Sequence, residues 1–200
     1  MQETFESASP EVQESSEPPE LLLEHKVLYH GSSASGIDEF NHAEETTVGS
    51  GVYFVDNPTD AAGYAKRRAK RSEQLSPVVY KVEIDKTRLA NLSSPQKLQE
   101  VMEGFAQVLE QKKASLPPES PWFVASAIDK SLEAIQGGIN VGQVKGVVAS
   151  QGSLFTQYLE SLGYDGLKTP EGGEGEDIGN HDTYLIFDPS KIKVISEYQG

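Results

Sequence analysis

Three separate segments of the sequence carry side chains that can do chemistry. His30 ends a short apolar run just before Gly31, Tyr53 lies in a second apolar run, and Asp182 and Thr183 begin a late one. Taken singly, each is weak evidence, because a histidine at a strand end commonly bonds to backbone groups and a strand tyrosine commonly packs against its neighbours. Together, an imidazole, a phenol ring and a carboxylate can hydrogen-bond and stack a ligand.

Other kinds of active site are excluded or disfavoured. The chain has no cysteine, which removes disulfides, thiolate metal ligands and cysteine nucleophiles. Its four histidines show no HxxxH or HExxH spacing, so we do not expect a metal-dependent enzyme. Residues 49–51 (GSG) resemble half of a nucleotide-binding loop, but no Lys-Ser/Thr pair follows and no GxGxxG pattern is completed. Both phosphate-loop interpretations therefore fail.

The first part of the chain is predicted to form strands around one helix. Runs rich in β-branched and aromatic residues, bounded by glycine, serine or proline, indicate short strands. These runs are residues 26–30, 52–55 and 78–84. Pro58 is expected at the first position of a helix that runs to about Arg71, with Asp56 or Asn57 as its N-cap.

A helical insert and three further strands are predicted to follow. Apolar side chains recur at helical spacing in three stretches, which indicates core packing rather than chemistry. These stretches are residues 95–109, 122–135 and 154–162. Short strands are expected at residues 166–168, 183–187 and 193–198, with a glycine-rich acidic loop at 171–180. Strands, then helices, then strands indicate an α+β fold in which the insert packs against one face of the sheet.

Length and composition predict one domain behind an acidic tail. Two hundred residues suffice for one domain with a full core. Residues 1–24 are rich in Glu, Ser and Pro and are expected to be a disordered tail, with the folded domain at 25–200. No run is long and apolar enough to cross a bilayer, and the acidic start is not a secretory signal, so no membrane association is expected.

The charge distribution disfavours nucleic acid as a partner. The formal net charge is −14, and residues 1–25 contain seven Glu with no Lys or Arg. Such an acidic surface repels phosphate backbones. The basic run at residues 66–71 is interpreted as a solvated helix face.

Taken together, the three segments resemble the histidine–tyrosine clade of ADP-ribosyltransferases, which includes diphtheria toxin and the poly(ADP-ribose) polymerases. Residues 28–32 (LYHGS) are similar to the family's strand with a His-Gly pair. Tyr53 and Tyr64 match the two family tyrosines at their usual separation of about eleven residues. Residues 183–188 (TYLIFD) resemble the late catalytic strand, and the resemblance covers roughly residues 26–198.

The resemblance implies a split antiparallel β-sheet core with a helical insert, and NAD+ as the substrate without a metal. It implies that His30 donates a hydrogen bond to the adenosine ribose, and that the backbone of Gly31 grips the nicotinamide carboxamide, with Ser32 beside it. Tyr53 and Tyr64 are expected to hold the nicotinamide ring between them, because stacked aromatics suit a flat cationic ring.

One family feature is missing at the late strand. The family commonly has a glutamate there, which binds the ribose 2′-hydroxyl and supports the developing positive charge, whereas this chain has Thr183. Asp182 is favoured as its replacement because a carboxylate stabilises positive charge better, although neighbouring strand residues face opposite sides, so a bulge or a frayed strand start is needed. Asp182, Thr183 and Tyr53 are the expected catalytic residues. The loop acids Glu171, Glu174, Glu176 and Asp177 are further candidates, with a solvated loop as the simpler interpretation.

The sequence therefore predicts a mono-ADP-ribosyltransferase that transfers ADP-ribose from NAD+ to a macromolecular acceptor, expected to be a protein. The missing glutamate argues against chain elongation more than against activity, since many mono-ADP-ribosyltransferases lack it. Domains of this kind are often toxins, secreted effectors or phage-delivered proteins, which implies action in the cytoplasm, including that of a host cell after delivery. Two alternatives stay open: an NAD+ glycohydrolase, in which water is the acceptor, and a catalytically inactive NAD-binding or scaffold module.

Overall fold

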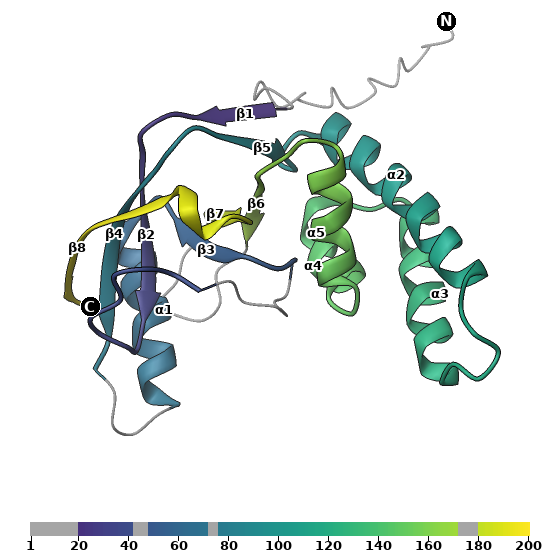
Figure 1. The fold of residues 1–200 in the computed structure, drawn as a ribbon, viewed down its shortest axis with the longest axis horizontal. Helices are drawn as coiled ribbons and strands as arrows, with labels where there is room; N and C mark the ends of the chain where they lie inside the picture. Colours follow the sequence, from purple (N-terminus) through teal and green to yellow (C-terminus); the bar gives the residue numbers. More distant parts are fainter. Residues whose placement is uncertain (1–19, 42–47, 72–75, 172–179) are drawn as a thin grey trace, which may run out of the picture.

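The structure, a computed structural model, describes residues 20–41, 48–71, 76–171 and 180–200 as an α+β domain (Figure 1). Its strands are β1 (Glu20–Leu23), β2 (Lys26–Ser32), β3 (Val52–Val55), β4 (Val78–Ile84), β5 (Thr87–Asn91), β6 (Gly166–Glu171), β7 (His181–Ile186) and β8 (Ile192–Gln199). Its helices are α1 (Pro58–Lys70), α2 (Pro95–Ala114), α3 (Trp122–Gln136), α4 (Val144–Val148) and α5 (Gly152–Ser161), with 3-10 turns η1 (Val141–Gln143) and η2 (Pro189–Lys191). None of the described helices is long and apolar enough to cross a bilayer.

The eight strands form one sheet that divides between β2 and β3. The strand order is β1-β5-β6-β7-β3-β2-β4-β8, and only the pair β5 and β6 is parallel among these neighbours. β2 pairs with β4 over all seven of its residues but shares one register pair with β3, Tyr29 with Val55. Beyond that pair the two halves separate, which is the split sheet that the sequence predicted.

The two halves pack on one another across a shared apolar core. Leu28 and Tyr80 from one half meet Phe54 and Tyr184 from the other, and all four are at most 4% exposed. Successive residues of a strand face opposite sides of the sheet. The residues of β3 that alternate with Phe54 therefore face away from this core, toward the helices.

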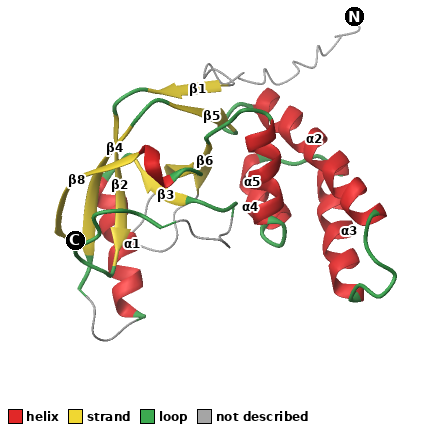
Figure 2. Ribbon diagram, viewed as in Figure 1, coloured by secondary structure: helices red, strands yellow, loops and turns green. Residues whose placement is uncertain are grey.

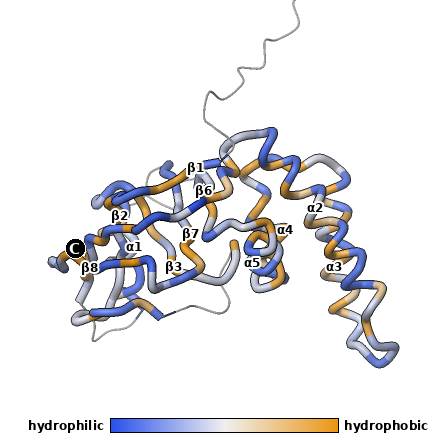
Figure 3. Tube along the Cα trace, turned by 45° about the horizontal axis from the view of Figure 1, so that its top comes forward, coloured by the Kyte–Doolittle hydropathy of each residue, from blue (hydrophilic) through white to orange (hydrophobic). Residues whose placement is uncertain are grey.

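The helices lie on this outer side of the sheet (Figure 2). α1 packs on β2 through Ala61 and Ala65, which are fully buried beside Val55. The insert formed by α2 to α5 packs on the other half through Leu167 and Leu185. Figure 3 shows hydrophobic residues in the central strands β3 and β7 and in the helices of the insert.

Most predicted elements are confirmed, with helix caps at Asn57 and Ser94. The predicted tail is wrong for residues 20–23, which form β1 and pair antiparallel with β5. This pairing buries Leu23 to 4% exposure, so a distant strand overrides the acidic local composition. Residues 1–19 lie outside the described part of the chain. β5 itself was not predicted.

Candidate functional site

A cavity of about 480 Å³ opens where β2 and β3 diverge. The end of β2, the start of β3, residues 36–41 and Arg68 of α1 line it. His30, Ser32 and Tyr53 are all among its lining residues. Its volume falls in the range of small-molecule sites. The divergence of the sheet thus brings together side chains from two of the segments that the sequence analysis singled out.

His30 is held as a neutral imidazole at this point. Its Nδ1 donates to the Tyr53 carbonyl at 2.7 Å, because a carbonyl oxygen can only accept. Burial lowers the pKa of His30 to about 4, and the nearby Arg68 charge adds to this effect while the Tyr53 hydrogen bond opposes it. The remaining nitrogen, Nε2, is therefore an acceptor, at 3.5 Å from Arg68 Nη1. A ligand hydroxyl would donate to it, whereas the resemblance implied a donor.

Gly31 lies at the same divergence, two residues beyond the single β2–β3 pair. A side chain there would overlap the Ala61 carbonyl and the Ala65 amide of α1. Glycine at this position therefore allows the helix to lie directly on the strand beside the cavity.

Tyr64 and Arg68 form one stripe on α1, because residues four apart lie on the same helix face. Arg68 as a residue is exposed, but its guanidinium end reaches the cavity and His30. Burial of that end, and then the charge of Arg71, lower the pKa of Arg68. One member of the basic run thus lines the cavity, and sequence reasoning missed it. The sequence feature that could have identified Arg68 is its spacing of four residues from Tyr64, which places both on one helix face.

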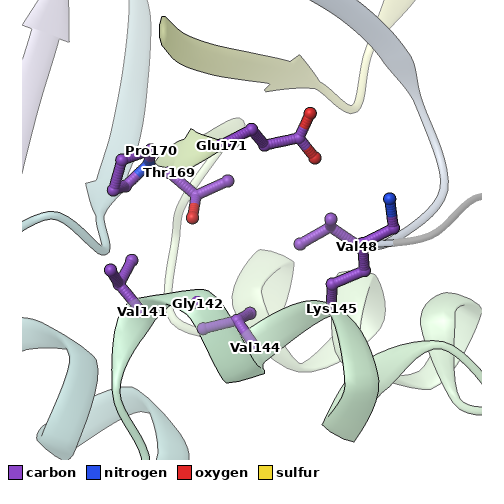
Figure 4. A pocket seen from close by; sticks show the side chains of 8 residues that line it. All are labelled: Val48, Val141, Gly142, Val144, Lys145, Thr169, Pro170 and Glu171. Atoms are coloured by element: carbon purple, nitrogen blue, oxygen red, sulfur yellow. The ribbon is translucent and has the colours of Figure 1, made fainter. Parts of the chain in front are cut away.

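Tyr53 also bonds to a residue that lines a second, smaller cavity of about 130 Å³. Its hydroxyl accepts a hydrogen bond from the Val48 backbone N–H at 2.9 Å, and Val48 lines the smaller cavity. Figure 4 shows Thr169 and Glu171 extending from β6 on one side of this cavity and Lys145 from the helical insert on the other. The volume is below that of a whole-ligand site, so only a fragment of a dinucleotide would fit.

A hydrogen-bonded cluster joins α1 to the ends of β6 and β7. The Tyr64 hydroxyl donates to Glu171 Oε2 at 3.1 Å and lies 3.1 Å from His181 Nε2. The Tyr64 and His181 rings meet edge-on, with centroids 5.6 Å apart. The His181 side chain is 2% exposed and that of Glu171 is 19% exposed. The third segment thus reaches Tyr64 through His181, a residue that the sequence analysis did not single out.

Thr183 and Asp182 point to opposite sides of β7. Thr183 pairs with Val55 and Thr169 on the helical side, is 2% exposed, and its hydroxyl has no hydrogen-bond partner among the described residues. Asp182 faces the other side and forms an ion pair with Lys168 Nζ at 3.0 Å. The register of β6 with β7 is regular, so the bulge that Asp182 needs is not present there. The structure does not bring Asp182 together with Tyr64 and Thr183.

A split antiparallel sheet, with a histidine and a tyrosine lining a cavity at the split, agrees with the expectation for an ADP-ribosyltransferase. The family model "ADP-Ribosyltransferase in polyvalent proteins" matches residues 24–200, and the chain belongs to this family. Family membership implies NAD+ as the substrate.

Other comparisons add little to this assignment. No curated protein sequence matches the chain. Among solved structures it is similar to a chain in the crystal structure of the M. tuberculosis MbcT-MbcA toxin-antitoxin complex, with a TM-score of 0.46 and 10% identity over 88% of this chain and 84% of that one. A likeness this distant carries no functional argument.

Proposed function

We propose that this domain is a mono-ADP-ribosyltransferase that transfers ADP-ribose from NAD+ to a protein and releases nicotinamide. The observation that carries the proposal is the convergence of His30, Tyr53 and Arg68 on one cavity, with Tyr64 one helical turn from Arg68. These residues come from β2, β3 and α1, and a shared ligand accounts for their meeting.

The groups in and beside this cavity suit different parts of NAD+. The His30 Nε2, as an acceptor, suits a hydroxyl of the adenosine ribose. The Arg68 guanidinium suits the diphosphate, because a planar cation with several donors matches phosphate oxygens. Tyr53 and Tyr64 are proposed to flank the nicotinamide ring, near Gly31.

The proposed reaction breaks the bond between ribose C1′ and the nicotinamide nitrogen. Both bonding electrons leave with the nitrogen, so the pyridinium becomes neutral nicotinamide, and the ribose carries an oxocarbenium-like positive charge. A nucleophilic oxygen or nitrogen of the acceptor then bonds to C1′ and releases its proton. Aromatic side chains that hold the ring in place favour this bond cleavage by positioning.

A protein acceptor and a single transfer fit the chain best. The net charge of −14 disfavours nucleic acid as the acceptor. Thr183 at the position of the family glutamate disfavours chain elongation. We propose that the domain acts as a toxin or effector in the cytoplasm, including that of a host cell after delivery.

The test is incubation of the protein with labelled NAD+ and a cell lysate, followed by separation of protein, nucleic acid and small molecules. Label on protein supports the proposal. Label recovered only as free ADP-ribose indicates an NAD+ glycohydrolase, and label on nucleic acid contradicts the proposed acceptor. NAD+ left untouched with every acceptor would favour an inactive NAD-binding module.

A further inference from the structure

We infer that Glu171, at the end of β6, supplies the carboxylate that stabilises the positive ribose, an inference that rests on the proposed transfer from NAD+. β7 itself offers no charge on the required face, because Thr183 is uncharged and Asp182 points to the other side. A carboxylate can reach the same place from the neighbouring strand.

The strand register places Glu171 beside Thr183. Glu171 lies opposite His181, and Thr183 is two residues further along β7 on the same face. Such diagonal neighbours in an antiparallel pair are about 7–8 Å apart, which a long side chain can span. The Glu171 carboxylate therefore lies on the same face, and near the same place, as the carboxylate of a glutamate at position 183 would.

Hydrogen bonds hold Glu171 as an acceptor in this place. Tyr64 has one hydroxyl proton and donates it to Glu171 Oε2. The contact of 3.1 Å between Tyr64 and His181 Nε2 then requires His181 to be the donor. Donation thus runs from His181 through Tyr64 to Glu171, which acts only as an acceptor, as an ionised carboxylate does. His181 and Tyr64 are positioning residues in this arrangement.

The second carboxylate oxygen remains for a ligand. Of the two oxygens, Oε2 takes the Tyr64 hydrogen bond, and Oε1 accepts none from any described residue. The side chain is 19% exposed and lines the smaller cavity (Figure 4). The buried Thr183 hydroxyl on the same face also lacks a hydrogen-bond partner within the described ranges. An acceptor and a hydroxyl on one face suit a ribose 2′-hydroxyl.

The carboxylate acts mainly when the glycosidic bond breaks. The nicotinamide ribose becomes positive only as the bond to nitrogen lengthens, so a fixed anion nearby stabilises the transition state more than bound NAD+. The inference therefore predicts a loss of rate with little loss of affinity.

The experiment compares Glu171→Gln and Glu171→Asp with Glu133→Gln, an exposed carboxylate on α3 that serves as the matched control. Nicotinamide release gives kcat, and calorimetry gives the Kd for NAD+. We expect Glu171→Gln to lower kcat about 100-fold or more. Its Kd should change by less than about threefold. Glu171→Asp should lose part of the rate because its carboxylate is one methylene shorter, and Glu133→Gln should match the parent.

Two results would overturn the inference. The first is a Glu171→Gln variant that turns over at the parent rate, and if its Kd alone rises, the result indicates a binding role. The second is a loss of rate in Asp182→Asn while Glu171→Gln stays active. If the parent binds NAD+ but releases no nicotinamide, both the proposed function and this inference fail. If the parent is active and Glu171→Gln is equally active, only this inference fails.

Discussion

The two ends of the site are built in different ways. Around His30 the cavity has about 480 Å³, and the imidazole is neutral and bonded to the backbone of Tyr53. Around Glu171 the cavity has about 130 Å³, and ionisable side chains bond to one another across α1, β6 and β7. In the proposed function, recognition at the first end depends on where the backbones of two strands diverge. The proposed charge stabilisation at the second end depends only on where a carboxylate lies in space.

This difference explains which residues keep their family positions. His30 and Gly31 need the end of β2, because the bond to the Tyr53 carbonyl and the close approach of α1 exist only there. A carboxylate has no such requirement, since its field acts over several ångströms in a low-dielectric site. The inferred position of the charge on β6 instead of β7 is therefore compatible with binding residues that keep their places.

The largest effect on the binding end is expected from Tyr53→Ala. This change removes the side chain of a residue that lines the larger cavity and that packs on the helical insert. Loss of an aromatic anchor typically costs about 2 kcal/mol or more, so the Kd for NAD+ should rise roughly 30-fold or more by calorimetry. Tyr53→Phe is the control, because it removes only the hydroxyl bonded to Val48 and should retain most of the affinity. Equal Kd values for Tyr53→Ala and the parent would contradict the placement of the ring.

A pH dependence of stability should distinguish the binding end from the cluster at Glu171. The pKa of His30 is about 4 in the folded protein, whereas the ordinary pKa of histidine is 6.5, so between these values the unfolded chain binds more protons. The stabilisation is complete above pH 6.5 and is lost as the pH falls toward 4. The free energy of unfolding should therefore fall by about 2 kcal/mol from pH 7 to pH 5, and urea unfolding at the two pH values measures this change.

The matched variant for this titration is His30→Gln, whose amide can still donate to the Tyr53 carbonyl but does not titrate. Its unfolding free energy should lose most of the slope between pH 7 and pH 5. The pKa values of Glu20, Asp188 and Glu197 are also lowered, but the stability that these carboxylates contribute is lost mainly below pH 4.5, outside this range. An unchanged slope in the variant would assign the effect to another group.

Local sequence patterns predicted most of the fold, and they singled out three residues, His30, Ser32 and Tyr53, that line the larger cavity. β3 and β4 have the predicted bounds, and α1 begins at Pro58 behind its Asn57 cap. These elements are specified by residues within a few positions of one another. β1 and β5 were missed because each is short and is stabilised by the other, with Leu23 paired to Thr87 across a long sequence separation.

The catalytic end was harder to predict because its geometry depends on register between strands. Glu171 was one of several acids in a glycine-rich stretch, and its sequence neighbours suggested a solvated loop. Only the pairing of β6 with β7 sets its carboxylate on the Thr183 face. Asp182 can reach the Thr183 side only through a bulge or a frayed strand start, and the register of β6 with β7 is regular at Asp182.

A smaller effect is expected from Arg68→Gln, which tests whether the binding end holds the diphosphate. A charged hydrogen bond contributes about 1.5 kcal/mol at an exposed position, so the Kd for NAD+ should rise roughly tenfold. Nicotinamide riboside, which has no diphosphate, should bind the variant and the parent equally. Lys66→Gln makes the same charge change at an exposed position that does not line the cavity, and should leave the Kd unchanged. Equal losses in both variants would indicate a general effect of charge.

The smallest effect on either end of the site is expected from shortening the N-terminus. β1 is the outermost strand of its half, with β5, β6, β7 and β3 between it and β2, so neither cavity contacts it. Deletion of residues 1–19 should leave NAD+ affinity, kcat and stability as in the parent. Deletion of residues 1–24 also removes Leu23, which is 4% exposed, and the bonds of Glu20 to Arg88 and Tyr164.

This longer deletion should therefore lower the free energy of unfolding by about 2 kcal/mol, which is the usual contribution of one buried leucine side chain. The Kd for NAD+ should stay the same. Urea unfolding and calorimetry on the two truncated proteins measure both quantities. If the longer deletion weakens NAD+ binding at temperatures where the protein is fully folded, β1 must act on the site through β5 and β6. NAD+ binding would then depend on contacts at the distant edge of the sheet, although neither cavity is lined by β1.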